Sequence, residues 1–166
     1  MVKLPRMLRH FLMPDWRVRQ CFPRRVLQAV EAAIAASEKN HAGEICFVVE
    51  AALSPSQLLG GESARERAID VFSSRRIWDT EGNNGVLIYV LLADRDVEIV
   101  ADRGLNDHVT QAEWEAICRS MEQAFAKREF EAGALAAVAA TGTLLMERFP
   151  LHSAGRNELT DRPMLI

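Results

Sequence analysis

Seven carboxylate and amide side chains flank two apolar segments in the middle of the chain: Asp79, Glu81, Asn83, Asn84, Asp102, Asn106 and Asp107. Oxygen atoms of this kind are the ligands that hard cations such as Ca²⁺ and Mg²⁺ prefer. The set lacks the D-x-D-x-D-G order and the final glutamate of an EF-hand loop. Loops beside strands are polar in any case. Two interpretations therefore stay open, a weak Ca²⁺ or Mg²⁺ site and a solvated polar rim.

The apolar segments predict the strands that position this set. Residues 86–92 form an unbroken apolar run typical of a buried strand, and residues 97–101 alternate as in a strand with one wetter face. The short turn at Asp94-Arg95-Asp96 between them predicts a solvated antiparallel hairpin held by an Arg–Asp contact. The loop before strand 86–92 and the loop after strand 97–101 then lie at one sheet edge, where we expect the seven oxygen-bearing side chains to gather.

The rest of the chain predicts helices on both sides of this sheet. Residues 44–50 form another apolar run, and a helix over residues 64–78 allows a right-handed crossover, so strands 44–50 and 86–92 should be parallel. Capping patterns and apolar stripes predict further helices over residues 23–39, after Ser54, after Thr110 and over residues 134–148. We expect a single-domain α/β/α sandwich with a small mixed sheet over residues 23–150, followed by a disordered tail over residues 151–166. Trp16, Trp78 and Trp114 are expected in the core or under the N-terminal segment.

Residues 1–22 form a basic segment, here called the N-terminal arm. Residues 1–25 carry a net +6, which leaves −9 for the rest of a chain whose net charge is −3. Leu4, Met7, Leu8 and Phe11 share one face of a helix. The arm is either an extra helix packed on the domain or an arm that binds a partner or an anionic membrane surface. The acidic body and the lack of a nucleic-acid motif argue against nucleic acid.

Cysteine usage and hydropathy indicate a cytoplasmic protein. Cys21, Cys46 and Cys118 are odd in number and have no C-x-x-C spacing, which predicts reduced packing residues. Charged residues interrupt the N-terminal apolar positions, so no secretory signal is expected. The uncharged run over residues 132–146 is shorter than the roughly 20 residues of a membrane span. A peripheral position at the inner face of a membrane, reached through the arm, is the alternative.

No catalytic residue can be identified from the sequence, and no organic cofactor is predicted. The C-x₅-R loop, the G-x-S-x-G elbow and a glycine-rich phosphate loop are all missing. His10, His41, His108 and His152 are scattered and are expected to be surface or packing residues. A phosphatase would need a metal to activate water, with Arg103 as a possible partner for the phosphate charge.

Four short motifs together resemble the TPM domain family over roughly residues 25–148. They are Asn84-Gly85-Val86-Leu87-Ile88, Asp94-Arg95-Asp96-Val97-Glu98-Ile99, Gly104-Leu105 and Phe130-Glu131-Ala132-Gly133. One position departs from the family pattern, because Asn106 stands where a glutamate is usual and the acid follows at Asp107. Without a signal or membrane helix, the chain resembles a short cytoplasmic branch of the family.

The resemblance implies an α/β/α sandwich and two alternative functions. Some family members have been ascribed calcium binding and acid phosphatase activity, and others accessory roles in membrane complexes. The first expectation is a non-catalytic accessory module that acts with a membrane-associated protein partner and binds a divalent cation weakly. The alternative is a metal-dependent acid phosphatase.

Overall fold

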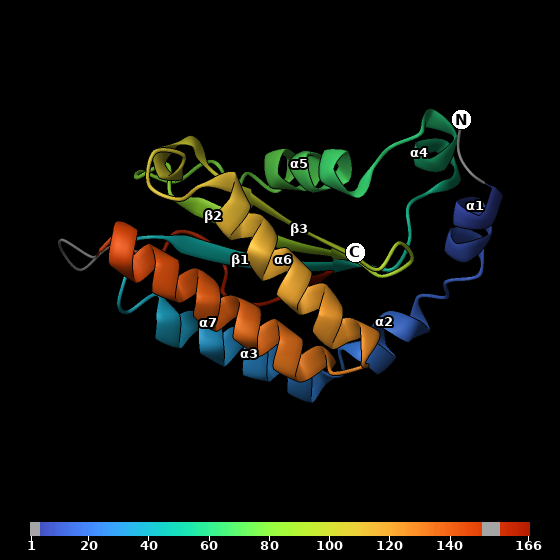
Figure 1. Ribbon diagram of the computed structural model, residues 1–166, viewed down its shortest axis with the longest axis horizontal. Helices are drawn as coiled ribbons and strands as arrows, with labels where there is room; N and C mark the ends of the chain where they lie inside the picture. Colours follow the sequence, from blue (N-terminus) through green and yellow to red (C-terminus); the bar gives the residue numbers. More distant parts are fainter. Residues whose placement is uncertain (1–3, 151–156) are drawn as a thin grey trace.

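The computed structural model describes residues 4–150 and 157–166, which form three layers (Figure 1). The middle layer is a sheet in the order β3-β2-β1-β4. Its strands are β1 (Glu44–Glu50), β2 (Gly85–Leu91), β3 (Asp96–Ala101) and β4 (Met164–Leu165). One face carries α3 (Arg24–Ser37), α6 (Gln111–Ala126) and α7 (Phe130–Arg148), and the other carries α5 (Ala64–Ser74). The predicted α/β/α class with a mixed sheet is confirmed.

The predicted strand directions are also confirmed. β1 pairs in parallel with β2, with Glu44 opposite Gly85, and β2 pairs antiparallel with β3, with Val86 opposite Ala101. Every residue of β1 and β2 is buried, because helices cover both faces of these two central strands. This burial is why both strands were recognisable as unbroken apolar runs.

The larger part of the core lies between the sheet and α3, α6 and α7. Phe22 marks one end of it, with ring centroids 6.0 Å from Phe47 and 5.8 Å from Phe125 and Phe130. Helix α7 starts at Phe130, so the break predicted around Gly133 is wrong. A Cβ at Gly133 would lie 2.8 Å from that of Ala124, so this glycine permits close packing of α6 and α7 inside the helix.

Helix α7 is also long and apolar enough to cross a membrane, by length and composition alone. It has 19 residues, and 39% of its most apolar 18-residue stretch is buried inside the fold. Figure 1 shows it lying beside α3 and α6 along its length. Its buried side includes Ala134, Ala137, Val138 and Leu145, which pack in the core.

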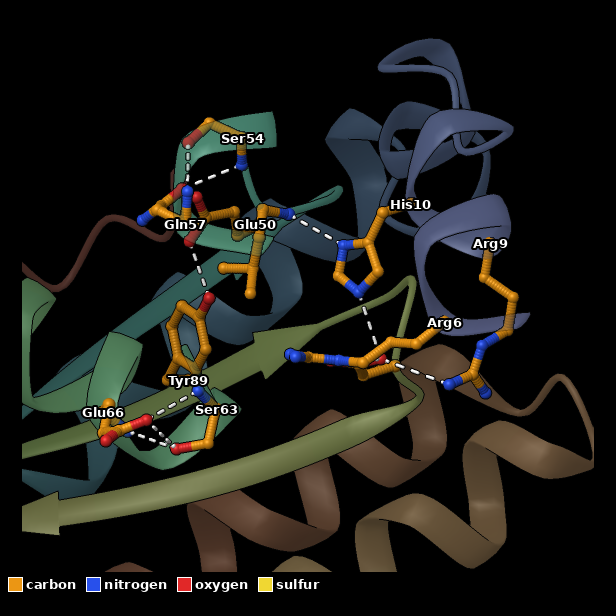
Figure 2. Close-up of polar contacts among 11 residues, drawn as sticks. Arg6, Arg9, His10, Glu50, Ser54, Gln57, Ser63, Glu66 and Tyr89 are labelled. Carbon is orange, nitrogen blue, oxygen red and sulfur yellow. Dashed lines mark hydrogen bonds and ion pairs between the residues drawn. The ribbon is translucent and has the colours of Figure 1, made fainter. Parts of the chain in front are cut away.

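A smaller core lies under α5 and the short helix α4 (Pro55–Gly60). Both helices begin with the predicted capping boxes, in which Ser54 pairs with Gln57 and Ser63 with Glu66. Tyr89 of β2 is fully buried on this face, and its hydroxyl donates to Glu50 Oε2 at 2.6 Å. Arg67 of α5 donates to both oxygens of the same carboxylate, at 2.8 and 3.1 Å (Figure 2 draws the Tyr89–Glu50 pair).

The C-terminal segment is structured where it is described, contrary to the predicted disordered tail. β4 pairs in parallel with β1, and the Ile166 N–H donates to the Val49 carbonyl at 3.0 Å. Leu159 and Met164 pack on the smaller core. The scattered apolar residues of this tail therefore extend the sheet, and residues 151–156 of the predicted tail lie outside the described residues.

The described part of the N-terminal arm forms α1 (Leu4–Phe11) and α2 (Trp16–Cys21). Val18 of α2 is buried in the larger core, followed by Phe22. Of the three tryptophans, Trp114 is buried as predicted, whereas the prediction is wrong for Trp16 and Trp78, which are 61% and 47% exposed. Residues 1–3 of the arm lie outside the described residues.

Candidate functional site at the β2–β3 loops

The loop before β2 and the loop after β3 are joined at one sheet edge, as their predicted directions require. The Asp102 N–H donates to the Gly85 carbonyl at 2.8 Å, and the Gly104 N–H donates to the Asn83 carbonyl at 3.0 Å. A Cβ at Gly104 would lie 2.5 Å from the Asn83 carbonyl oxygen, so the two loops can approach this closely only with glycine there.

Two of the seven predicted site residues are buried at this edge and keep an oxygen without a hydrogen bond. Asp102 and Asn84 are each 7% exposed. Asp102 Oδ1 caps the 3₁₀ turn η1 (Arg103–Leu105) by accepting from the Arg103 N–H at 2.7 Å, whereas Oδ2 has no partner within the described structure. The Asn84 amide nitrogen donates to the Ala42 carbonyl, and its Oδ1 likewise lacks a partner there. Each of these two oxygens is therefore buried without a hydrogen-bond donor among the described residues.

The other five residues are not gathered around these two oxygens. Asp79 forms an ion pair with Arg76 at 2.5 Å, and Asn83 Oδ1 accepts from the Arg103 Nε at 3.1 Å. Glu81, Asn106 and Asp107 are exposed. Among the described residues, no three His, Cys, Asp or Glu side chains are placed to hold one ion. Asp102 and Asn84 each keep one buried oxygen of the kind that Ca²⁺ or Mg²⁺ binds, and these two are a small part of the six to eight ligands that Ca²⁺ takes.

The hairpin turn at the opposite edge is not the solvated Arg–Asp turn that was predicted. The Asp94 side chain is 10% exposed and contacts three side chains of α1. Arg6 donates to both of its oxygens, at 2.9 and 3.2 Å from Nε and at 2.7 Å from Nη2, and Arg9 Nη2 lies 3.4 Å from Asp94 Oδ1. His10 Nε2 lies 3.0 Å from Asp94 Oδ1, and Figure 2 shows all three side chains pointing from α1 toward the hairpin. Arg95, which has φ 58°, was the wrong partner.

His10 joins Asp94 to the backbone at Leu53. It is 3% exposed, and its Nδ1 accepts from the Leu53 N–H at 3.0 Å. A ring nitrogen that accepts carries no proton, so the ring proton lies on Nε2 and faces Asp94. Burial alone would raise the pKa of Asp94, but the hydrogen bonds from Arg6 and His10 outweigh it and hold this pKa below its ordinary value. The sequence signal for this site was the i, i+4 spacing of Arg6 and His10.

Comparison with known proteins agrees with this fold. A family profile described as the TPM domain matches residues 19–144, about three quarters of the chain. The chain belongs to the TPM domain family. The NMR structure of the BA42 protein from the psychrophilic bacterium Bizionia argentinensis is similar to it, with a TM-score of 0.74 and 28% sequence identity. The match covers 85% of this chain and 92% of that one. No curated protein matches the chain.

A hollow of about 350 Å³ lies on this TPM domain where β3, α5 and α6 meet. Its rim carries the carboxylates of Asp96, Glu98, Glu115 and Glu122, beside Arg65 and Arg119. Burial, and then the charges of Glu98, Glu122 and Asp94, raise the pKa of Asp96 to about 6. Burial raises the pKa of Glu98 as well. Sequence analysis missed this site because its residues come from three elements and form no linear motif.

A second group of carboxyls lies beside the C-terminal segment, which follows the residues that the TPM profile matches. Glu44 Oε2 accepts from the Glu158 and Leu159 N–H groups at 3.3 and 3.1 Å. Glu38 Oε1 accepts from the Ile45 N–H at 2.7 Å. Burial raises the pKa of Glu38 to about 8, against this hydrogen bond, with further contributions from Glu44 and Asp161. Glu38 is thus held largely protonated at neutral pH.

Proposed function

We propose that this chain is a non-catalytic accessory module that binds a basic segment of a partner protein, expected to be membrane-associated. The observation that supports the proposal most is the hollow of about 350 Å³ between β3, α5 and α6. A volume of this order accommodates one or two long side chains. Its four carboxylates outnumber its two arginines, so its charge is complementary to lysine or arginine.

The pKa values of the rim support a cationic occupant. The pKa of Asp96 is raised to about 6, by burial first and then by neighbouring negative charges. A bound cation would relieve the repulsion among these carboxylates, whereas an anion would increase it. Proton release by Asp96 and cation binding are thereby coupled, so affinity for a basic ligand should rise between about pH 5 and pH 7.

The edge of β3 determines how the partner would be recognised. Its outward Val97 N–H donates to Glu122 Oε1 at 3.1 Å, and its Ile99 carbonyl accepts from Arg65 at 2.5 Å. Side chains of α5 and α6 therefore occupy the backbone groups that an added strand would need. We infer that the partner inserts basic side chains into the hollow and does not extend the sheet.

The test compares binding of a lysine-rich peptide with that of a glutamate-rich peptide of the same length, by calorimetry at pH 7. The lysine-rich peptide should bind, and an Asp96→Asn, Glu98→Gln double variant should weaken it at least tenfold. The matched control is Glu129→Gln, Glu147→Gln, which removes two exposed carboxylates elsewhere. Equal binding of both peptides, or equal loss in the two variants, would refute the proposal.

The alternative function is a metal-dependent acid phosphatase-like hydrolase at the β2–β3 loops. It is supported by the buried, unpaired oxygens of Asp102 and Asn84. These two residues would hold a Ca²⁺ or Mg²⁺ ion, which when bound would supply an activated water. Arg103 follows Asp102 in the chain, and its backbone N–H donates to Asp102 Oδ1. Its guanidinium could neutralise the charge of a phosphate.

Calcium titration of chelator-treated protein tests the ion site. Heat release together with thermal stabilisation at millimolar calcium, lost in Asp102→Ala, would support it. For catalysis, the parent must hydrolyse a generic phosphomonoester faster than the Asp102→Ala, Asp107→Ala double variant. If the two rates are equal, the hydrolase function is excluded, whatever the calorimetry shows.

A further inference from the structure

Helix α1 has the reverse of the orientation usual for an amphipathic helix on a globular domain. Its polar residues Arg6 and His10, one turn apart, face the body and contact Asp94. Its apolar residues Leu4, Leu8 and Phe11, spaced four and three apart, are 78%, 57% and 60% exposed. The hydrophobic side of the helix therefore faces away from the hydrophobic core.

Two more exposed apolar side chains follow α1 along the chain. Leu12, whose N–H donates to the Leu8 carbonyl at 3.0 Å, is 70% exposed, and Trp16 at the start of α2 is 61% exposed. We call these five side chains the apolar rim: Leu4, Leu8, Phe11, Leu12 and Trp16. Helix α4 lies at the same end of the molecule and carries Leu59, which is 73% exposed (Figure 1).

The contacts of α1 hold this orientation in place. Turning the apolar rim inward would break the hydrogen bonds from Arg6 to both oxygens of Asp94 and the hydrogen bond from the Leu53 N–H to His10. It would also expose Asp94, a carboxylate whose side chain is 10% exposed. The fold thus uses charge pairing to present an apolar surface outward, and such a surface indicates an interaction site.

Basic side chains accompany the apolar rim. Arg9, Arg17 and Arg19 are exposed on the same two helices, and Arg24 and Arg25 follow at the start of α3. Asp15 is the one acid among residues 4–25. Bulky apolar side chains, an exposed tryptophan and flanking arginines are the combination that lies in the headgroup region of an anionic bilayer.

We propose that the apolar rim docks this protein on an anionic lipid surface, with Leu4, Leu8, Phe11, Leu12 and Trp16 inserted among the headgroups. Arg17 and Arg19 pair with lipid phosphates or carboxylates beside them. The docking is peripheral and reversible, since a few inserted side chains give much weaker attachment than a membrane-spanning helix. This surface is separate from the acidic hollow, so either proposal can fail without the other.

The test is flotation with vesicles of phosphatidylcholine containing 30% phosphatidylserine, compared with phosphatidylcholine alone. The full chain should float with the anionic vesicles, less so in high salt, and much less with phosphatidylcholine alone. A Leu8→Ser, Leu12→Ser variant should lower the partition coefficient at least tenfold, because two apolar side chains no longer leave water. Arg17→Gln, Arg19→Gln should weaken binding to the anionic vesicles selectively.

The matched control is Ile69→Ser, Met146→Ser, which changes two other exposed apolar residues, on α5 and α7. It should float like the parent, and thermal melts should show all three double variants folded, since each changed side chain is exposed. Failure of the parent to float, or equal flotation of Leu8→Ser, Leu12→Ser, would overturn the proposal. So would sedimentation showing that the apolar rim instead joins two copies of the chain.

Discussion

Arg6 donates hydrogen bonds to both carboxylate oxygens of Asp94, although 88 positions separate the two residues in the sequence. This contact joins the start of the chain to the β2–β3 turn. It also determines which side of α1 faces water. An ion pair therefore fixes the position of the surface to which we assign lipid contact.

Removing Asp94 should release α1. Asp94→Ala leaves Arg6 and the buried His10 without their partner, so we expect a loss of about 3 kcal/mol, the usual cost of breaking a buried ion pair. Asp79→Ala is the control, because its pair with Arg76 is exposed, and it should cost less than about 1 kcal/mol. Urea denaturation measures both. Hydrogen exchange at the Leu53 N–H, which is bonded to His10, should accelerate only in Asp94→Ala.

Acid should weaken the same contact. The pKa of Asp94 is lowered in the folded protein, so its stabilising contribution is complete above its unfolded pKa of about 3.8 and is lost as the pH falls through the lower folded value. The stability difference between the parent and Asp94→Asn should therefore shrink as the pH falls below 4. A difference that stays unchanged from pH 4 down to pH 2 would contradict this assignment.

For Glu38 we expect the opposite dependence of stability on pH. Its pKa is raised to about 8, so the folded state retains a proton that the unfolded chain releases near pH 4.5. The parent should lose stability as the pH rises from about 4.5 to 8, because unfolding releases this proton. Glu38→Gln keeps a neutral group of the same shape, so its stability relative to the parent should increase over this interval and level off above pH 8. Paired denaturation curves at each pH measure the difference.

Asp96 should likewise make the folded protein less stable as the pH rises, but over a lower pH interval than Glu38. Its pKa is raised to about 6, so ionisation opposes folding progressively from about pH 3.8 to pH 6. Asp96→Asn should melt at a higher temperature than the parent at pH 7.5 and at nearly the same temperature at pH 3.5. Asp70→Asn, an exposed acid on α5, should leave the melting temperature unchanged at both.

Gly85 should tolerate no side chain. A Cβ there would overlap the Ile77 carbonyl oxygen, a backbone atom that cannot rotate away, so Gly85→Ala should cost about 2–3 kcal/mol. At Gly60, where a Cβ would meet nothing within 4 Å, alanine should be neutral or slightly stabilising. Chemical denaturation of both variants compares the two glycines directly.

The strands, their directions and the capped helices could be predicted because each depends on local sequence. Residues 86–92 are apolar without interruption because two layers of helices bury β2, and Ser54, Ser63 and Thr110 cap helices through residues three positions later. Gly133 misled the prediction because it permits close helix packing in the first turn of α7, whereas a glycine in sequence indicates a break.

The candidate sites depend on contacts that no local pattern encodes. Arg95 is adjacent to Asp94 in sequence, yet the fold supplies Arg6 from a distant helix. The fates of the seven loop side chains likewise depended on the fold. Arg76 and Arg103 pair with Asp79 and Asn83, whereas Asp102 and Asn84 each keep one buried oxygen without a hydrogen bond among the described residues. Strand β4 has two residues, which are too few to indicate a strand in the sequence before its pairing with β1 is known.

The buried Tyr89–Glu50 pair also makes the protein its own optical reporter. Tyr89 is the single tyrosine of the chain, and burial, followed by the hydrogen bond to Glu50, raises the pKa of its phenol. A free tyrosine ionises near pH 10, and the phenolate absorbs at longer ultraviolet wavelengths than the phenol. In an alkaline titration, the folded protein should stay silent at those wavelengths past pH 10. The phenolate absorbance that then appears at higher pH measures the fraction of molecules in which the sheet around Tyr89 has opened.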